Sequence, residues 1–187
     1  MRKTIILLTT ALLIITIIYT LFQVIRVQDI ILRRIFPKEY SEYVERYAAE
    51  FDIDPLLIYS IIKAESNFDQ RARSRVGAIG LMQVMEPTAI EVAQGLGIDI
   101  YDTSKLYQPS INIRIGVAYF RTLKDLYDGN KNLAIIAYNG GRGNVSAWIA
   151  EGVIQPDGSD PENVPFPETN MYIRRILRNY EIYRRIY

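Results

Sequence analysis

Residues 54–65 have the sequence Asp-Pro-Leu-Leu-Ile-Tyr-Ser-Ile-Ile-Lys-Ala-Glu. An aspartate followed by proline is typical of a helix start, with the acidic side chain as N-cap and the proline in the first turn. Leu57, Ile61 and Glu65 follow at intervals of four residues, so they share one face of the predicted helix. The pattern therefore predicts a helix that turns Glu65 toward the same side as its core residues.

This placement gives Glu65 a chemical interpretation. A carboxylate among apolar side chains is costly to ionise, so we expect the pKa of Glu65 to lie above the ordinary value of about 4.3. A raised carboxyl pKa is what a general acid needs near neutral pH. The helix pattern alone also allows a second interpretation, in which Glu65 ends the helix and its side chain reaches solvent.

Further helices are predicted on both sides of this stretch. In the longest of them, Ile113, Val117 and Phe120 recur at helical spacing, and Gly129 provides a stop. No alternating strand pattern persists, so the predicted fold class is all-α. The expected helices cover residues 40–51, 54–65, 87–97, 109–128, 133–138, 145–151 and 168–187, with a Gly-rich turn at 140–143 and a proline-containing loop at 152–167.

The first 36 residues form a separate segment. Residues 5–25 are an almost continuous apolar run, and 21 helical residues reach roughly 31 Å, about one hydrocarbon core. No small-residue cleavage site follows, and the chain has no cysteine for lipid attachment. We therefore expect an uncleaved transmembrane anchor, continued by a juxtamembrane helix until Pro37. The predicted domains are residues 1–36, the anchor, and residues 37–187, the folded domain.

The charges around the anchor do not settle its orientation. Arg2 and Lys3 precede the apolar run, but Arg26, Arg33 and Arg34 follow it. The positive-inside rule therefore does not favour export of the C-terminal domain. The side of the membrane has to be inferred from the chemistry of the domain instead.

Composition narrows the possible chemistry. Hydrophobic residues make up 49% of the 187 residues and charged residues 23%, which excludes a disordered polymer. The formal net charge is only +1, which argues against a nucleic-acid binder. There is no cysteine and no histidine, so the usual zinc, haem and iron–sulfur ligands and the Cys–His and Ser–His–Asp catalysts are excluded.

Four short motifs occur in order along the folded domain. They are Glu-Ser at 65–66, Gly-Leu-Met-Gln at 80–83, Ala-Tyr-Asn at 137–139 and Glu-Thr-x-x-Tyr at 168–172. This ordered set closely resembles the catalytic domain of the soluble lytic transglycosylase family, and the resemblance extends from about residue 47 to 183. It implies a lysozyme-like helical domain, here preceded by an N-terminal transmembrane helix.

The resemblance also implies the roles of individual residues. Glu65 matches the family's sole catalytic acid and base, and Ser74 matches a serine near the N-acetyl group of the substrate. The residues that match the sugar cleft and its closing motif are Gln83, Met85, Tyr138, Asn139, Glu168 and Tyr172. Met85 and Tyr172 also fit a simpler role as core residues.

The implied reaction cleaves the β-1,4 bond between N-acetylmuramic acid and N-acetylglucosamine. Glu65 protonates the leaving oxygen, the acetamido oxygen assists at C1, and anionic Glu65 then takes the proton of the C6 hydroxyl as a 1,6-anhydro ring closes. Tyr138 is expected to stabilise charge at Glu65 or at the intermediate. The resemblance implies no cofactor and no metal, with peptidoglycan strands as the partner on the extracytoplasmic side of the membrane.

Two alternatives remain open from the residues. One is a lysozyme-like hydrolase that uses Glu65 with water as acceptor and a second carboxylate. Asp69 and Glu86 are near in sequence, but neither belongs to a motif. The other alternative is a non-catalytic glycan-binding or scaffolding module, which would not need the acid.

Two further patterns have simpler explanations. Residues 128–132 begin like a calcium loop, but Leu133 and Asn139 stand where the loop requires glycine and glutamate. The last predicted helix is rich in arginines. They are explained either as a solvated helix face or as a surface that attracts an acidic wall polymer or a membrane. They are Arg174, Arg175, Arg178, Arg184 and Arg185.

Overall fold

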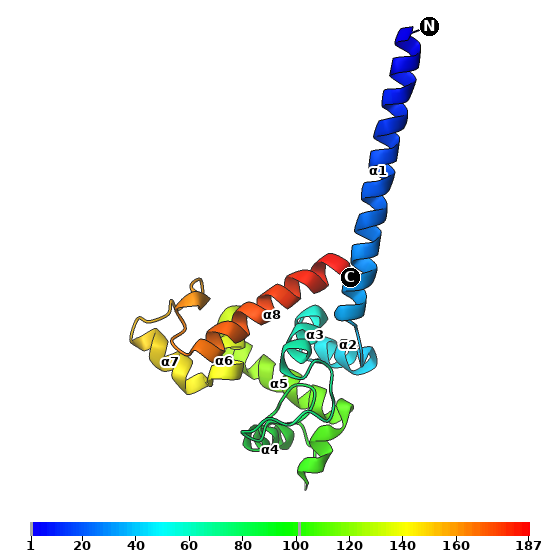
Figure 1. Cartoon of the computed structure of the whole chain (residues 1–187). Helices are drawn as coiled ribbons and strands as arrows, with labels where there is room; N and C mark the ends of the chain where they lie inside the picture. Colours follow the sequence, from blue (N-terminus) through cyan, green and yellow to red (C-terminus); the bar gives the residue numbers. More distant parts are fainter. Residues whose placement is uncertain (1, 101) are drawn as a thin grey trace. The chain divides into compact units, whose positions relative to one another are not determined.

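The computed structural model describes residues 2–100 and 102–187, and these residues are helical without a named strand. The only β contacts among them are isolated antiparallel bridges, Arg73 with Ile79 and Ile79 with Val84. The all-α prediction is therefore confirmed. Figure 1 shows the helices in chain order: α1 (Arg2–Ile35), α2 (Ser41–Glu50), α3 (Pro55–Glu65), α4 (Glu86–Gly95), η1 (Thr103–Tyr107), α5 (Pro109–Leu126), α6 (Lys131–Gly140), α7 (Arg142–Ala150), η2 (Pro161–Asn163) and α8 (Pro167–Ile186).

The chain forms two compact units, of which one ends at Pro37 and the other begins at Lys38. The first unit is essentially α1, a single helix of 34 residues. At 1.5 Å per residue it extends about 51 Å, well beyond a hydrocarbon core of about 30 Å. Within it, Leu12–Ile35 is long and apolar enough to cross a membrane by length and composition. The predicted span at residues 5–25 overlaps this stretch.

The core of the second unit is built around α5. This helix contacts α2, α4 and α6, and Ile113, Val117 and Phe120 on its inner side are completely buried. Helix α3 packs against α2, and α7 packs against α6. The side chains along α3 from Leu57 to Ile62 are buried as well, so α3 is enclosed on nearly all sides until its last turn.

Helix ends follow the local sequence, with small shifts from prediction. The carboxylate of Asp54 accepts a hydrogen bond from the backbone N–H of Leu56 at 2.8 Å, as expected of an N-cap. The predicted Gly-rich turn at 140–143 is shorter in the structure, because only Gly141, with a φ of 85°, separates α6 from α7. Its positive φ reverses the chain in one residue, a conformation that glycine adopts without steric cost.

A long loop, residues 66–85, connects α3 to α4 and is held by the buried side chain of Asn112 on α5. The Asn112 carbonyl accepts from the N–H of Met82 at 2.8 Å, and its amide donates to the carbonyls of Ile79 and Leu106 at 2.9 and 2.8 Å. Gly80 passes so close to this amide that a Cβ atom would lie 2.4 Å from it. The loop therefore presents Met82 and Gln83 at a defined position beside the end of α3.

Candidate active site

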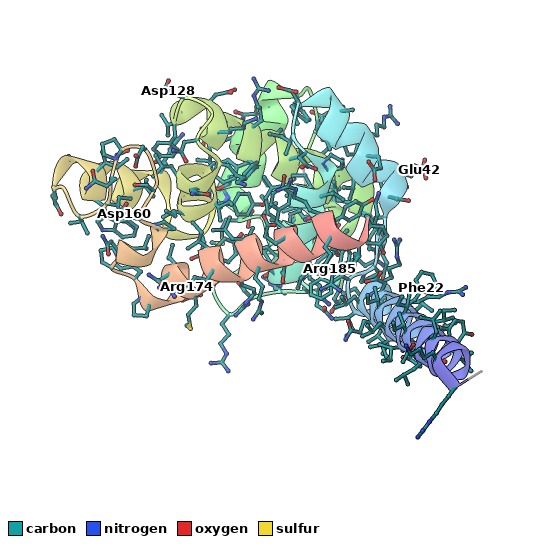
Figure 2. The ribbon with its side chains drawn as sticks, turned by 90° about the horizontal axis from the view of Figure 1, so that it is seen from above. Phe22, Glu42, Asp128, Asp160, Arg174 and Arg185 are labelled. Atoms are coloured by element: carbon teal, nitrogen blue, oxygen red, sulfur yellow. The ribbon has the colours of Figure 1, made fainter. Side chains whose placement is uncertain are left out.

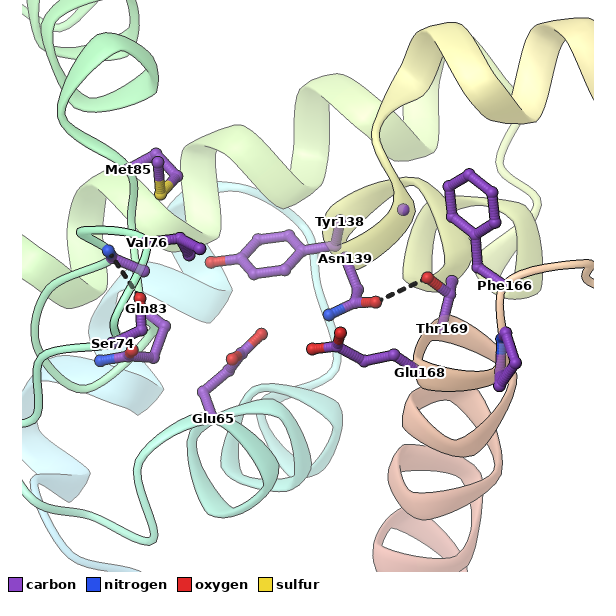
Figure 3. Close-up of a pocket in the computed structure, with 13 residues that line it drawn as sticks. Glu65, Ser74, Val76, Gln83, Met85, Tyr138, Asn139, Phe166, Glu168 and Thr169 are labelled. Atoms are coloured by element: carbon purple, nitrogen blue, oxygen red, sulfur yellow. Dashed lines mark hydrogen bonds between the residues drawn. The ribbon is translucent and has the colours of Figure 1, made fainter.

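A cleft of about 570 Å³ lies where the end of α3, the 66–85 loop, the end of α6 and the start of α8 meet (Figure 3). It collects most of the residues that the motifs single out. Its lining consists of Glu65, Ser74, Val76, Ala78, Gln83, Met85, Tyr138, Asn139, Gly140, Phe166, Pro167, Glu168 and Thr169. Tyr172 is the one predicted site residue that does not line this cleft, and it lies directly behind Glu65.

Glu65 occupies the last position of α3. The hydrogen bonds of Ser66 explain why a serine follows it. The Ser66 hydroxyl lies 2.8 Å from the carbonyl of Leu81 and 3.2 Å from that of Ile62. Ser66 thus joins the end of α3 to the 66–85 loop. Asn67 and Phe68 then adopt positive φ angles of 51° and 66°, which turn the chain sharply away from the helix. The carboxylate is left pointing into the cleft (Figure 3).

The hydrogen-bond partner of Glu65 comes from the far end of the chain. The hydroxyl of Tyr172 on α8 donates to Glu65 Oε1 at 2.6 Å. Burial and the neighbouring carboxylate raise the pKa of Tyr172 well above its ordinary value, so it stays a protonated donor. The other carboxylate oxygen of Glu65 is not used by this bond.

The surroundings of Glu65 raise its pKa to about 7, and burial is the largest cause. The Tyr172 hydrogen bond and the charge of Arg175 act in the opposite direction, because both stabilise the anion, while Glu168 raises the pKa further. The first sequence interpretation of Glu65, a carboxyl in apolar surroundings, matches this electrostatic environment. A pKa near the working pH favours a carboxyl that acts first as an acid and then as a base.

Tyr138 lines the cleft and also holds the 66–85 loop in place. Its hydroxyl donates to the carbonyl of Met82 at 2.8 Å, and its ring packs against Tyr119 with centroids 5.5 Å apart. With Asn112 holding the N–H of Met82, both backbone groups of this residue are fixed. Tyr172, and not Tyr138, is therefore the tyrosine bonded to Glu65.

Gln83, Ser74 and Met85 form the wall contributed by the loop. The Gln83 amide nitrogen donates to the carbonyls of Gly80 and Ala72 at 2.9 and 3.2 Å, which leaves its carbonyl oxygen to accept a bond from a ligand. The Ser74 hydroxyl accepts from the N–H of Ala78 at 2.9 Å and keeps its own proton to donate. Met85 is 39% exposed, so it is a surface of the cleft and not a core residue.

The opposite wall comes from α6 and α8. The hydroxyl of Thr169 donates to Asn139 Oδ1 at 2.8 Å, which leaves the Asn139 amide nitrogen free toward the cleft (Figure 3). Glu168, in the first turn of α8, brings a second carboxylate to the same cleft as Glu65. The sequence predicted Glu168 only as a wall residue, since the two positions are a hundred residues apart. Asp69 and Glu86, the nearer carboxylates in sequence, do not line the cleft.

Some cleft residues carry no sequence signal of their own. Phe166 precedes α8, is 46% exposed, and its ring meets Trp148 edge-on with centroids 4.9 Å apart. An exposed aromatic ring held by a second one is a suitable apolar surface for a sugar ring. In the sequence, Phe166 is recognisable only as a residue before a proline, and this pattern indicates the start of a helix. It does not indicate a contact with a ligand.

The cleft continues into a smaller cavity of about 230 Å³. The two share Gln83, Met85, Tyr138 and Asn139, and the smaller one adds Val84, Thr88, Tyr119 and Gly141. A ligand larger than one sugar therefore has a continuous path between the 66–85 loop and α6.

No group of three or more acidic side chains is placed to hold a metal ion within residues 2–100 and 102–187. In the segment that begins like a calcium loop, Asn130 has a structural role. Its side-chain oxygen accepts from the N–H groups of Asn132 and Leu133 at 3.0 and 3.1 Å and so caps α6. Asn130 is therefore the N-cap of α6.

Comparison with known proteins places this fold and cleft in a family. The sequence profile described as "Transglycosylase SLT domain" matches residues 42–157. The chain belongs to the transglycosylase SLT domain family. The match begins within α2 and ends after α7, and it contains three of the four motifs and most of the cleft.

Relatives and solved structures agree with this assignment. The soluble lytic murein transglycosylase of Salmonella typhimurium is 33% identical over 152 residues, which cover 80% of this SLT chain and 23% of the relative. The membrane-bound lytic murein transglycosylase C of Edwardsiella ictaluri is 31% identical over 176 residues, with 79% of this chain and 47% of the relative covered. The chain thus spans about a quarter of the soluble relative's length and about half of the membrane-bound one's.

Two solved structures share the fold. An inactive mutant of the lytic transglycosylase Slt from Pseudomonas aeruginosa superposes with a TM-score of 0.74 at 36% identity, covering 80% of this chain and 24% of that chain. The 70 kDa soluble lytic transglycosylase from Escherichia coli gives a TM-score of 0.74 at 29% identity, with 82% and 25% covered. The lysozyme-like fold predicted from the motifs is confirmed.

Proposed function

We propose that this protein is a membrane-anchored lytic transglycosylase of peptidoglycan. The observation that carries the proposal is Glu65, a carboxyl whose pKa is raised to about 7, bonded to Tyr172 and facing a cleft of about 570 Å³. A pure glycan-binding module has no need for such an acid. Membership of the transglycosylase SLT domain family supports the substrate and the reaction class.

The first step breaks the β-1,4 bond between N-acetylmuramic acid and N-acetylglucosamine. Tyr172 occupies Oε1 of Glu65, so Oε2 carries the acidic proton and delivers it to the leaving glycosidic oxygen. The acetamido oxygen of the muramic residue forms a bond to C1 as the glycosidic bond breaks. The Gln83 carbonyl and the Asn139 amide, both free toward the cleft, orient the sugar through its N–H and hydroxyl groups.

The second step closes the anhydro ring. Glu65, now an anion, removes the proton of the C6 hydroxyl, O6 bonds to C1, and the bond from the acetamido oxygen breaks. Glu65 regains its proton and no water is consumed, so the reaction needs no cofactor. Tyr172 and Arg175 stabilise the anion between the two steps, since both lower the pKa of Glu65.

A hydrolase is the second candidate, and Glu168 is the observation that favours it. A second carboxylate in the same cleft is what an acid–base hydrolase uses to activate water. Product mass separates the two reactions, because anhydromuropeptides are one water lighter than reducing ends. Purified sacculi incubated with the full-length protein should release anhydro products, and the Glu65→Gln protein should release at least roughly 10²-fold less. Reducing ends that disappear in a Glu168→Gln protein would favour the hydrolase.

We further propose that residues 1–36 anchor the protein in the cell membrane by a single pass, with residues 37–187 on the cell-wall side. The apolar length of α1 and the membrane-bound relative support anchoring. The substrate supports the orientation, because peptidoglycan lies outside the cytoplasm. An alkaline phosphatase fused after Tyr187 should be active only if this end is exported. Activity of a cytoplasmic reporter at the same position would contradict the orientation.

A further inference from the structure

Helix α8 carries five arginines, of which Figure 2 labels Arg174 and Arg185, and they differ in their interaction partners. Arg174 donates to Asn170 at 2.8 Å, Arg184 lies 3.6 Å from Glu181, and Arg185 also has an interaction partner. Within the described part of the chain, neither Arg175 nor Arg178 makes a hydrogen bond or an ion pair, and both are exposed. A solvated helix face alone does not explain why the unbonded arginines are these two.

The two unbonded arginines lie on the edge of α8 that starts in the cleft. Arg175 follows Glu168 by seven residues, which brings it back to within about 20° of Glu168 around the helix axis. Arg178 follows three residues later and lies about 60° further round, on the same half of the helix. At 1.5 Å per residue, Arg175 is about 10 Å and Arg178 about 15 Å along the axis from Glu168. The charge of Arg175 also acts on Glu65 and Tyr172, so its guanidinium lies within electrostatic reach of the reacting carboxyl.

This cationic edge has the charge to bind carboxylates of a ligand that also occupies the cleft. The following step rests on the function proposed above. Muramic acid carries a lactyl group whose carboxyl is extended by a peptide stem, and the stem bears free carboxylates. A guanidinium binds a carboxylate through two parallel N–H···O bonds, which gives both charge and orientation.

We propose that Arg175 and Arg178 bind carboxylates of the peptide stem attached to the muramic acid in the cleft. The helix that carries both arginines starts in the cleft, where Glu168 lines it, and the charge of Arg175 acts on Glu65. The group that they bind should therefore be part of the same molecule as the glycan in the cleft. An independent acidic wall polymer or a lipid surface would not have to reach Glu65. The arginines therefore select stem-bearing strands over bare ones.

Affinity for strands with and without stems tests the proposal. The full-length protein in detergent, with Glu65→Gln to prevent turnover, is titrated with glycan strands that keep their stems and with strands stripped by an amidase. We expect tighter binding of the stem-bearing strands, with a difference that shrinks as salt is raised. Arg178→Gln should weaken only that binding, by about three- to fivefold, as expected of a solvent-exposed charge pair.

Arg184→Gln is the matched control, because it removes the same charge from an exposed arginine on the same helix. It should leave both affinities unchanged. Arg175→Gln should weaken stem-dependent binding too, and in the active protein it should also move the pH profile on both substrates, since Arg175 lowers the pKa of Glu65.

Three results would overturn the inference. The first is equal affinity for stem-bearing and stripped strands. The second is an equal loss of affinity for both kinds of strand in Arg178→Gln. The third is the same loss of stem-dependent affinity in Arg184→Gln. Binding of neither strand would refute the proposed function, and this inference with it. Binding of stem-bearing strands without cleavage by the active protein would refute the reaction alone.

Discussion

At the scale of the residue, the behaviour of the cleft depends on one carboxyl and the tyrosine that donates to it. Tyr172 bonds to Glu65 Oε1, and this bond stabilises the anionic form of the acid. Burial acts in the opposite direction and more strongly. The pKa of Glu65 thus depends on two opposing effects, burial and the Tyr172 hydrogen bond, which separate mutations can change.

Removing the Tyr172 hydroxyl should shift that balance in a known direction. In Tyr172→Phe the anion loses its donor, so the pKa of Glu65 should rise, by about one unit if the bond has the usual strength of one to a charged group. Loss of activity at alkaline pH should then begin about one pH unit higher than in the wild type, with a lower maximum rate because the carboxyl is less well oriented. The pH profile of kcat/KM on purified sacculi measures this. A profile that stays in place would show that the bond does not form in solution.

The raised pKa of Glu65 also makes stability depend on pH. The folded state holds this proton up to about pH 7, whereas the unfolded chain releases it near 4.5. Between these values the folded state binds more protons, so stability should fall as pH rises through this window. The loss is at most about 3 kcal/mol, from 1.36 kcal/mol per pKa unit.

Glu65→Gln should remove this loss, because the glutamine oxygen still accepts from Tyr172 and no charge is buried. Its free energy of unfolding, measured by urea denaturation at pH 4.5 and pH 8, should exceed that of the wild type only at the higher pH. A constant difference between the two proteins across this range would contradict the pKa of Glu65.

At the scale of the elements, the 66–85 loop is positioned from two sides. Asn112 on α5 binds the N–H of Met82, and Tyr138 on α6 binds its carbonyl. Gln83 follows directly, with a positive φ of 47° that its neighbours must maintain. The loop forms this wall of the cleft, and helices of the core fix the position of the loop.

Asn112→Ala should destabilise the second unit by about 2–4 kcal/mol, because it leaves the buried N–H of Met82 and the carbonyls of Ile79 and Leu106 without partners. Asn144→Ala is the control, since Asn144 at the start of α7 is exposed and its side chain donates only to the carbonyl of Gly140, the last residue of the preceding helix α6. It should cost about 0.5 kcal/mol or less. Thermal unfolding followed by circular dichroism measures both values, and equal losses would show that Asn112 does not hold the loop.

At the scale of the whole molecule, the second unit contains its own core. Its buried apolar side chains come from α2 to α8, and α8 is fixed to α3 at both ends. Near its start Tyr172 bonds to Glu65, and near its end Tyr180 donates to Asp54 and Tyr183 stacks on Tyr59 with ring centroids 5.7 Å apart. We therefore expect this unit to be stable without α1.

A fragment of residues 38–187 should accordingly be soluble without detergent. It should unfold in one cooperative transition and give a helix-dominated far-UV circular dichroism spectrum. A fragment that ends at residue 179 should be much less stable, because it lacks the contacts of Tyr180 and Tyr183. If residues 38–187 aggregate or unfold without cooperativity, the unit depends on α1 after all.

The sequence by itself determined the helices, the order of the motifs and the placement of Glu65 at the end of α3. These features depend on neighbours within a few positions, such as the Asp54 cap and the i, i+4 spacing toward Glu65. Only the tertiary structure decided which groups meet the acid. Tyr172 is 107 residues from Glu65, and its spacing with Ile173 and Ile176 is equally compatible with a core stripe. Glu168 joins the cleft for the same reason, because the packing of α8 against α3 cannot be derived from either helix alone.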